Sequence, residues 1–596
     1  MSDAAPSSRR RFLQSSLTVG AASAAGVGLA GCDASGLRGS VSDWWRGQSQ
    51  SVEHIGGGFV DDNWQRGHWL RDRTQAVPEP TVQRRVQVLI AGGGVAGLAA
   101  ARALRLRGVD DFALLELEDS AGGNARSTRL QGLACPMGAH YLPVPGDSAH
   151  EVQDLLEDLG LRRRVAGRWV LDERTLCHSP QERLWIGGQW QDGLLPLLGV
   201  GERTLAQYRQ LALTIAQLRR SVRWSMPAVK TPLQPVQQAL AAINFVAWLD
   251  AQGLDDPHLR WYLNYCCQDD YGAGAATVSA WAGLHYFAAR HGFAAPGVER
   301  SAEDASEGLF TWPEGNAWLT RQLAAPLGER LHTAQVVLRI APQRHGVQVD
   351  AWDFARQQAV RWTAQQVVVA LPAHVAARVV QPSLPWLEQA RALVHAPWLV
   401  ANLHLRSALH DKPGAAPSWD NVLYGQPNLG YVDAQHQSLH PVPGATVLTY
   451  YRALMDTPWN ETVPAAGTLP PAQAALQARR HLLQTPWADW RSRIVAELAA
   501  AHHDLPAKAT ELRITRHGHA MAVPLPQKSG QIGLYSTYSK LGVLSKREQT
   551  TALHTPRVRA QYALATDRLL FAHSDWAGYS VFEEAFTLGH WAGSLA

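Results

Sequence analysis

The alternation of apolar and polar residues predicts a strand, a turn and a helix around residue 90. A continuous apolar run from Val86 to Ala91 is followed by a glycine cluster and then by the alanine-rich stretch from Val95 to Leu106. The short run is typical of a buried strand, and the longer stretch has helical spacing. A second apolar run, Phe112 to Leu115, predicts another strand.

Farther along, the pattern changes between long helical segments and short extended ones. Helical spacing extends from Thr204 to Trp224 and again from Val236 to Leu254. Alternating or continuous apolar residues predict strands over 334–340, 346–349 and 366–371. The chain contains no internal repeat.

Glycines at fixed spacing connect the first predicted strand to its helix. Residues 92–97 supply Gly-x-Gly-x-x-Gly in the context that dinucleotide binding requires. Gly92 permits a tight turn, Gly94 lets the backbone approach a pyrophosphate, and Gly97 lets helix and strand pack closely. The helix N-terminus attracts the phosphate charge. The predicted dinucleotide contacts are Gly92, Gly94, Val95, Ala96 and Gly97.

A carboxylate follows the second strand where a ribose partner is expected. Glu116 lies about 20 residues after the glycines and would accept hydrogen bonds from ribose hydroxyls. A carboxylate also argues against a 2′-phosphate there. The alternative is a solvated charge at a strand end.

The first 32 residues combine the patterns of two export signals. Residues 8–13, Ser-Arg-Arg-Arg-Phe-Leu, resemble a twin-arginine signal, and the apolar run Leu17 to Ala30 is too short to cross a bilayer. Residues 29–32, Leu-Ala-Gly-Cys, resemble a lipoprotein cleavage site at which Cys32 becomes the lipidated N-terminus. We therefore expect a partner in the twin-arginine export machinery, export in the folded state, and a lipid anchor on the periplasmic side of the inner membrane. The alternative is a disordered tail with a chance arginine pair.

Composition excludes several kinds of partner. The 596 residues carry a formal net charge of +4 without a long basic run beyond the signal, so nucleic acid is not expected. The cysteines after residue 32 show no spacing of a zinc site or a disulfide framework, and no metal is predicted. The 23 Trp against 11 Phe indicate either structural packing or the wall of a ligand cavity.

Later motifs carry a family resemblance. Glu116 followed by paired glycines at 122–123 resembles the FAD signature of the flavin amine oxidase and phytoene desaturase superfamily. Residues 312–319 resemble its Pro-x-Gly-Gly segment, residues 369–372 its strand ending in Leu-Pro, and residues 571–593 its C-terminal FAD motif. The resemblance extends from about residue 86 to the end.

This resemblance implies a noncovalently bound FAD, because no cysteine follows Cys267 to form the cysteinyl-flavin bond of monoamine oxidases. Asn124 replaces an Arg that many members carry, and His573 replaces a Gly before the acid Asp575. Residues 398–402 lack the Lys that amine oxidases usually carry near flavin N5. The implied cofactor contacts are Gly122, Gly123, Asn124, Arg126, Val337, Asp575, Val581 and Phe582.

The C-terminal segment predicts a strand, a polar turn and a helix, so the chain returns to the fold with which it starts. Residues 580–583, Ser-Val-Phe-Glu, form a capping-box pattern that predicts a helix from there to about Ala592. In the family this helix N-terminus points at the flavin and would stabilise its anionic reduced form. The alternative is an ordinary amphipathic helix.

The predicted fold class is α/β, with a Rossmann-like FAD-binding domain built from separated segments and an interleaved α+β substrate domain. The predicted boundaries are a signal peptide at 1–32, a tether at 33–85, FAD-binding segments at 86–145, 311–385 and 566–596, a largely helical substrate-domain region at 146–310, and further substrate domain at 386–565.

Catalytic residues are harder to predict, since flavin oxidation asks little of the protein. Asp270 belongs to an acid-aromatic cluster that could attract a cationic amine, and a polar helix-loop junction is the alternative. Asp420, beside Trp419 and Tyr424, is a second candidate partner for a cation. His519 is a candidate for polarising substrate or orienting water.

The resemblance implies an FAD-dependent oxidoreductase that oxidises a small molecule, an amine by preference, through hydride transfer to flavin N5. An isoprenoid or carotenoid-like desaturase or isomerase is a second hypothesis. A non-catalytic flavoprotein lipoprotein acting in assembly or interaction is a third. Acid groups facing the flavin would favour oxidation of an amine. An apolar tunnel would favour a lipid substrate, and a blocked flavin face would favour the non-catalytic role.

Overall fold

A computed structural model describes residues 51–596, without 61–62, 73–76, 178–180, 232, 301–307, 439–441, 457–467, 528–565 and 567. The chain divides into Met1–Ser51 and Val52–Ala596, and the elements below belong to the second unit. The predicted signal with Cys32 lies outside the described residues. Within the described ranges, no helix combines the length and apolarity needed to cross a membrane.

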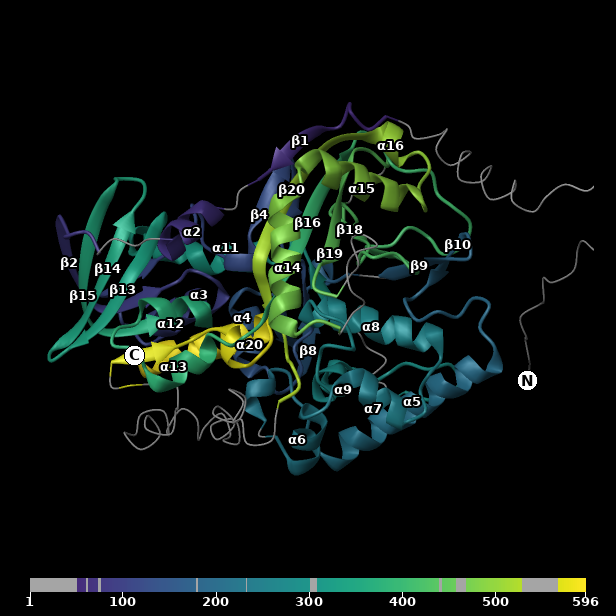
Figure 1. Ribbon diagram of the computed structural model, residues 1–596, viewed down its shortest axis with the longest axis horizontal. Coiled ribbons are helices and arrows are strands. Elements are labelled where there is room, and N and C mark those ends of the chain that lie inside the picture. The colour runs from purple at the N-terminus through teal and green to yellow at the C-terminus, as the bar shows by residue number, and fades with distance from the viewer. Residues whose placement is uncertain are drawn as a thin grey trace, which may run out of the picture. The chain divides into compact units, whose positions relative to one another are not determined.

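One sheet of seven strands grows from the predicted strand-turn-helix. Its strands are β2 (Val82–Ala91), β3 (Phe112–Leu115), β12 (Leu331–His332), β13 (Gln335–Gln343), β14 (Gly346–Asp353), β15 (Gln358–Val369) and β21 (Leu569–Phe571). The order is β12-β3-β2-β15-β14-β13, and β21 pairs with the end of β15. Figure 1 labels β2, β15, β14 and β13 of this sheet. The pairs around β2 are parallel, whereas β13, β14 and β15 are antiparallel neighbours. Burial on both faces explains the continuous apolar runs.

The last helix packs directly on the first helix of this sheet. α3 (Val95–Leu106) begins after the glycine turn, and α20 (Phe582–Leu595) ends the chain. A Cβ atom at Gly589 would lie 2.0 Å from the carbonyl oxygen of Ala96, and one at Gly593 would lie 2.3 Å from that of Ala100. The two backbones therefore touch at positions where only glycine fits.

The second sheet has eight strands that come from distant parts of the chain. They are β1 (Gly56–Phe59), β9 (Glu182–Ile186), β10 (Gln189–Asp192), β16 (His395–Leu405), β17 (Asp420–Leu423), β18 (Tyr431–Asp433), β19 (Thr446–Ala453) and β20 (Ala509–Ala522). Their order is β1-β20-β16-β19-β18-β17-β9-β10. Every residue of β16 is buried, so this strand runs through the core.

A group of helices, labelled in Figure 1, shares an apolar core with this sheet. They are α5 (Glu202–Ser221), α6 (Pro235–Ala241), α7 (Phe245–Ala251), α8 (Pro257–Tyr271) and α9 (Ala280–Ala288). The single helix predicted from Val236 to Leu254 is wrong, because α6 and α7 are separate. Asn244 causes the break, since its side-chain oxygen accepts a hydrogen bond from Ala247 N at 2.7 Å and caps a new helix.

Secondary structure begins inside the segment that the sequence predicts to be a tether. β1 pairs in parallel with β20, and α2 (Trp64–Asp72) follows it. A Cβ atom at Gly57 would lie 1.9 Å from Leu512 O, so this glycine serves close strand pairing. The glycines and polar residues of this segment are typical of a flexible linker. The strand could not be recognised from them, because its pairing partner lies far away in the sequence.

The described chain contains further strands and helices outside the two large sheets and the helices above. They are β4 (Ser127–Leu130), β5 (Leu133–Pro136), β6 (Tyr141–Pro143), β7 (Arg162–Val165), β8 (Arg168–Leu171), β11 (Leu309–Thr311), α4 (His150–Asp158), α11 (Ala317–Ala324), α12 (Ala373–Val379), α13 (Pro385–Ala390), α14 (Pro471–Gln484), α15 (Trp487–Ala499) and α16 (Leu505–Lys508).

Gly589→Ala should destabilise the protein by about 1–3 kcal/mol, since the added methyl group forces α20 away from α3. Denaturant unfolding followed by circular dichroism measures the change. Gly67→Ala in α2 is the matched control, because nothing lies within 4 Å of a Cβ atom at that helical position. We expect the control to be neutral or to gain up to about 1 kcal/mol. Equal stability of wild type and Gly589→Ala would contradict the close packing.

Candidate active site

A cavity with about 1430 Å³ of free space lies at the carboxyl ends of β2, β3 and β15, where α3 begins. This edge is where ligands bind in parallel α/β sheets. Its wall extends from the glycine turn before α3 to the first turn of α20, a length that suits a dinucleotide. Among the predicted cofactor contacts, its wall includes Gly92, Gly94, Val95, Ala96, Glu116, Gly122, Gly123, Asn124, Val337, Asp575, Val581 and Phe582.

The three motif glycines differ in what a side chain would meet. A Cβ atom at Gly92, where φ is +102°, would lie 2.3 Å from Ala370 O. One at Gly97 would lie 1.9 Å from Gly92 O, so Gly97 sits behind the cavity wall and serves packing. At Gly94 the nearest atom is 3.9 Å away, and a side chain would occupy open cavity. The backbone at Gly94 is therefore free for the approach of a diphosphate.

Glu116 is fixed at the cavity wall by two backbone groups. Gly93 N donates to its Oε2 at 2.7 Å, and Glu118 N donates to its Oε1 at 2.8 Å. Burial raises the pKa of this carboxyl group, while the two backbone donors oppose that shift. The side chain lies on the cavity wall, where a ribose can reach it.

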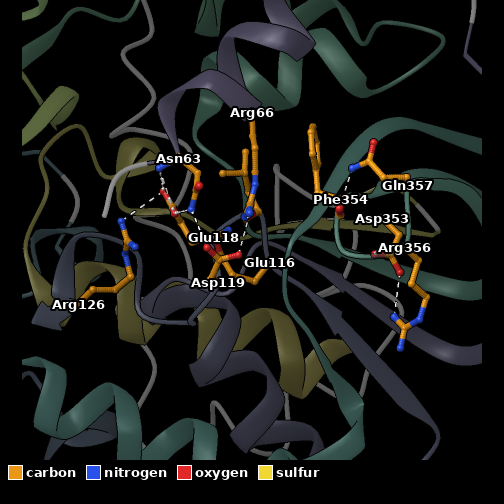
Figure 2. A network of polar contacts seen from close by, with 11 residues as sticks. Asn63, Arg66, Glu116, Glu118, Asp119, Arg126, Asp353, Phe354, Arg356 and Gln357 are labelled. Atoms are coloured by element: carbon orange, nitrogen blue, oxygen red, sulfur yellow. Dashed lines mark hydrogen bonds and ion pairs between the residues drawn. The ribbon is translucent and has the colours of Figure 1, made fainter. Parts of the chain in front are cut away.

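Helix α2 and the residue before it, Asn63, form hydrogen bonds with the loop after β3 (Figure 2). Asn63 Nδ2 donates to Glu118 Oε2 at 2.7 Å, and Arg66 donates to Leu117 O at 2.7 Å. Leu70 of the same helix lines the cofactor cavity. Sequence reasoning missed this contribution because α2 is polar and carries no motif.

Two predicted details of the cofactor site need correction. Arg126 does not lie on the cavity wall, because its guanidinium pairs with Glu118 Oε1 at 3.3 Å (Figure 2). The predicted capping box does not form, because Val581 is the N-cap of α20 and has no side-chain cap. Ser580 instead accepts a hydrogen bond from Ala522 N at 3.1 Å, which joins α20 to β20.

A second cavity of about 860 Å³ adjoins the first. The two share wall residues, among them Asn124, Ala520 and Phe582. Part of its wall is aromatic, where His140 stacks on Tyr451 with ring centroids 4.3 Å apart. We call it the substrate cavity. None of its described lining residues is a lysine, and Trp398 and Val400 of β16 face it instead.

Three carboxyl groups face the substrate cavity, namely Asp269, Asp270 and Glu583. Asp270, the predicted candidate, is 4% exposed and pairs with Arg290, whose Nη2 lies 2.8 and 3.1 Å from its two oxygens. Burial and the neighbouring Asp270 raise the pKa of Asp269 to about 7. Burial raises the pKa of Glu583 to about 6. Of these two acids, Asp269 is the one whose pKa lies near neutral pH.

Asp420 lies in an outer chamber of about 1510 Å³, which shares His140, Tyr141 and Asp269 with the substrate cavity. Burial, Glu182 and Asp269 raise the pKa of Asp420 well above its ordinary value. Burial therefore favours the uncharged form of this carboxyl group, and the role of Asp420 as a cation partner stays a prediction.

The other predicted groups of the site separate in the structure. Trp419 lies near His140, with ring centroids 5.5 Å apart, whereas Tyr424 packs on Trp261 at 4.6 Å. His519 lines the cofactor cavity and not the substrate cavity. The substrate wall carries His517, whose Nε2 lies 2.6 Å from Met137 O, as well as His140.

Comparison with known proteins connects this geometry to a family. The model of the family described as "Flavin containing amine oxidoreductase" matches residues 95–411, more than half of the chain. Protein anon-37Cs of Drosophila lebanonensis is 32% identical over 90 residues, which are 15% of this chain and 16% of that protein. The chain thus matches about a sixth of the length of this curated relative.

Solved structures share the fold at low identity. A putrescine oxidase bound to putrescine superposes with a TM-score of 0.57 at 17% identity, covering 86% of this chain and 99% of the other. A fatty acid isomerase that produces CLA, from P. acnes, superposes with a TM-score of 0.53 at 14% identity, covering 85% and 97%. These likenesses confirm the predicted α/β fold with its Rossmann-like domain.

Gly94→Val should abolish FAD binding without unfolding the protein, because the branched side chain fills cavity space that the backbone leaves for the diphosphate. Flavin absorbance per protein measures the loss, and circular dichroism checks the fold. Gly146→Val is the control, since that exposed glycine has no atom within 4 Å of a Cβ position. Acid precipitation of the wild type should leave the flavin in the supernatant. Full FAD content in Gly94→Val would refute the assignment.

Proposed function

We propose that this chain, which belongs to the flavin containing amine oxidoreductase family, oxidises a cationic amine with FAD as its cofactor. The observation that carries the proposal is the set of buried carboxyl groups in an aromatic cavity that adjoins the cofactor cavity. An ammonium group is stabilised both by carboxylates and by aromatic faces.

Asp269 is suited to prepare the amine for oxidation. An ammonium group has no lone pair, so it must lose a proton before a hydride can leave the adjacent carbon. With its pKa at about 7, Asp269 can accept that proton near neutral pH. Bound FAD would supply the hydride acceptor, and a protonated imine would remain. Arg290 keeps Asp270 paired, which leaves the proton transfer to Asp269.

The two other hypotheses find less support in the site. The isomerase that shares this fold acts on a fatty acid, so the fold alone admits a lipid substrate. The substrate cavity here, however, carries three carboxyl groups and Arg290, which an apolar chain would leave unsolvated. A non-catalytic role gains no support from a cavity that adjoins the cofactor site.

Anaerobic flavin reduction by amines should speed up with rising pH and level off above about pH 7, because only the ionised Asp269 accepts the proton. Asp269→Asn should remove this rising limb and slow reduction at least about 100-fold. Stopped-flow absorbance with panels of amines and of neutral polyenes measures both.

Asp147→Asn, at an exposed loop position, is the matched control and should keep the wild-type profile. A wild-type profile in Asp269→Asn would reject the role of this residue. Reduction by polyenes but by no amine would reject amine oxidation and favour the desaturase hypothesis.

We further propose that the chain is exported folded by the twin-arginine route and anchored through Cys32 on the periplasmic side of the inner membrane. The support is the order of the arginine pair, the apolar run and the cleavage sequence in residues 8–32. A protein that acquires its cofactor before export must cross the membrane folded.

The two signals act at different steps, so their variants should differ. Replacing Arg9 and Arg10 by Lys should leave precursor in the cytoplasm, whereas Cys32→Ala should prevent lipid attachment and cleavage. Cell fractionation and mass spectrometry of the N-terminal peptide distinguish these results. Soluble cytoplasmic wild-type protein would overturn the localisation.

A further inference from the structure

The cofactor cavity has an unusual charge balance for a diphosphate site. Its described wall carries the carboxyl groups of Glu116 and Asp575, and none of its described lining residues is Lys or Arg. A bound FAD adds a negative charge on each phosphoryl group. The wall residues that can become cationic are His395, His519 and His573. The site therefore needs a source of positive charge beyond the helix N-terminus.

Two residues of the cavity wall illustrate this balance. Asn124, next to the paired glycines, is uncharged, and His573, two residues before Asp575, is titratable.

The histidines surround one carboxylate. His395 Nε2 lies 3.0 Å from Asp575 Oδ2, and His573 Nδ1 lies 3.3 Å from Asp575 Oδ1. His374 stacks on His519 with ring centroids 4.6 Å apart and meets His395 edge-on at 5.1 Å. We call His374, His395, His519 and His573 around Asp575 the histidine cluster. Its members come from α12, β16, β20 and the turn after β21.

Two histidines of the cluster are neutral beside an ionised Asp575. The cluster's histidines lower the pKa of Asp575 well below the ordinary value, so the carboxylate is ionised. Burial lowers the pKa of His374 to about 4 and that of His519 to about 2, so both imidazoles are neutral. The positive charge of Arg479, from α14, adds to this lowering of both pKa values. A diphosphate placed beside the cluster acts in the opposite direction and favours protonation.

A metal ion is the rival source of charge, since ligand atoms of His374, His395 and Asp575 lie within 4.8 Å of one another. The hydrogen bonds argue against it. Asp575 Oδ2 already accepts from Ala373 N at 2.8 Å and from His395 Nε2 at 3.0 Å. Because an ionised carboxylate only accepts, His395 Nε2 carries the proton of this bond, and a metal on Oδ2 would have to displace both donors.

We propose that the histidine cluster is the cationic half of the diphosphate site and takes up a proton from solvent when FAD binds. The inference rests on FAD as the cofactor in the proposed function. It does not depend on the identity of the substrate. The proton goes to the histidine cluster on the cavity wall, and there it offsets the charge of the phosphoryl groups.

Calorimetric titration of FAD into the apoprotein tests the proposal. At pH 7.5, buffers with different ionisation enthalpies should give different apparent binding enthalpies, and the slope should correspond to about one proton taken up per FAD. By linkage, the FAD Kd should rise about tenfold per pH unit over the range in which the bound cluster loses that proton. ADP-ribose, which has the same diphosphate without the flavin, should also take up a proton.

The variant with both His395→Gln and His573→Gln should lose the proton uptake and the pH dependence, because glutamine keeps a hydrogen-bond donor but does not titrate. Its FAD Kd should be weakened about tenfold or more at pH 6.5 and approach the wild-type value at high pH. His345→Gln, at an exposed turn, is the matched control and should behave as wild type. Circular dichroism checks the fold of each apoprotein.

Wild-type binding enthalpies that do not depend on the buffer, with a Kd that is constant from pH 6.5 to 9, would overturn the proposal. Copurification of a stoichiometric metal, with FAD binding abolished by EDTA, would overturn it in favour of a metal site. Failure to bind FAD would refute the cofactor and this inference together. Failure to oxidise amines would refute the substrate proposal and leave this one standing.

Discussion

The contact on which the cofactor site depends is the packing of α20 against α3. Gly589 and Gly593 let the last helix lie on backbone carbonyls of the first, so the end of the chain is fixed at its dinucleotide motif. The same helix begins at the cavities. Its first turn, at Val581 and Phe582, lines both the cofactor and the substrate cavity. A shift of this helix would therefore change both cavities at once.

Charge in these adjoining cavities is controlled mainly by burial. On the substrate side burial raises the pKa of Asp269 and Glu583, and on the cofactor side it lowers the pKa of His374 and His519. Both effects favour the neutral form, which costs less to bury than an unpaired charge. A bound ammonium group or diphosphate would reverse the preference. On the proposed function, the site would thus become charged where its ligands bring the opposite charge.

The local parts of the fold could be predicted because their cause is local. The helix Val95–Leu106 and the strand Phe112–Leu115 have the predicted bounds, since continuous apolar runs and a glycine turn determine them. The strand Gly56–Phe59 could not be predicted, because its partner Glu511–Ile514 lies in a distant part of the chain. The role of α2 could not be predicted either, because this helix and the residue before it bind the loop after β3, which comes later in the sequence.

The candidate site shows the same limit at the scale of single residues. Asp269 and Asp270 are neighbours in the last turn of α8, and Arg290 decides that Asp270 is the paired one. No local pattern contains that information. His517 and His519 are separated along β20 by about 7 Å, the length of two strand residues. Because the two cavities meet at Ala520, this short distance places one ring on the substrate wall and the other on the cofactor wall. Sequence spacing can therefore bring a side chain to the flavin site, but long-range packing decides which chemistry it serves.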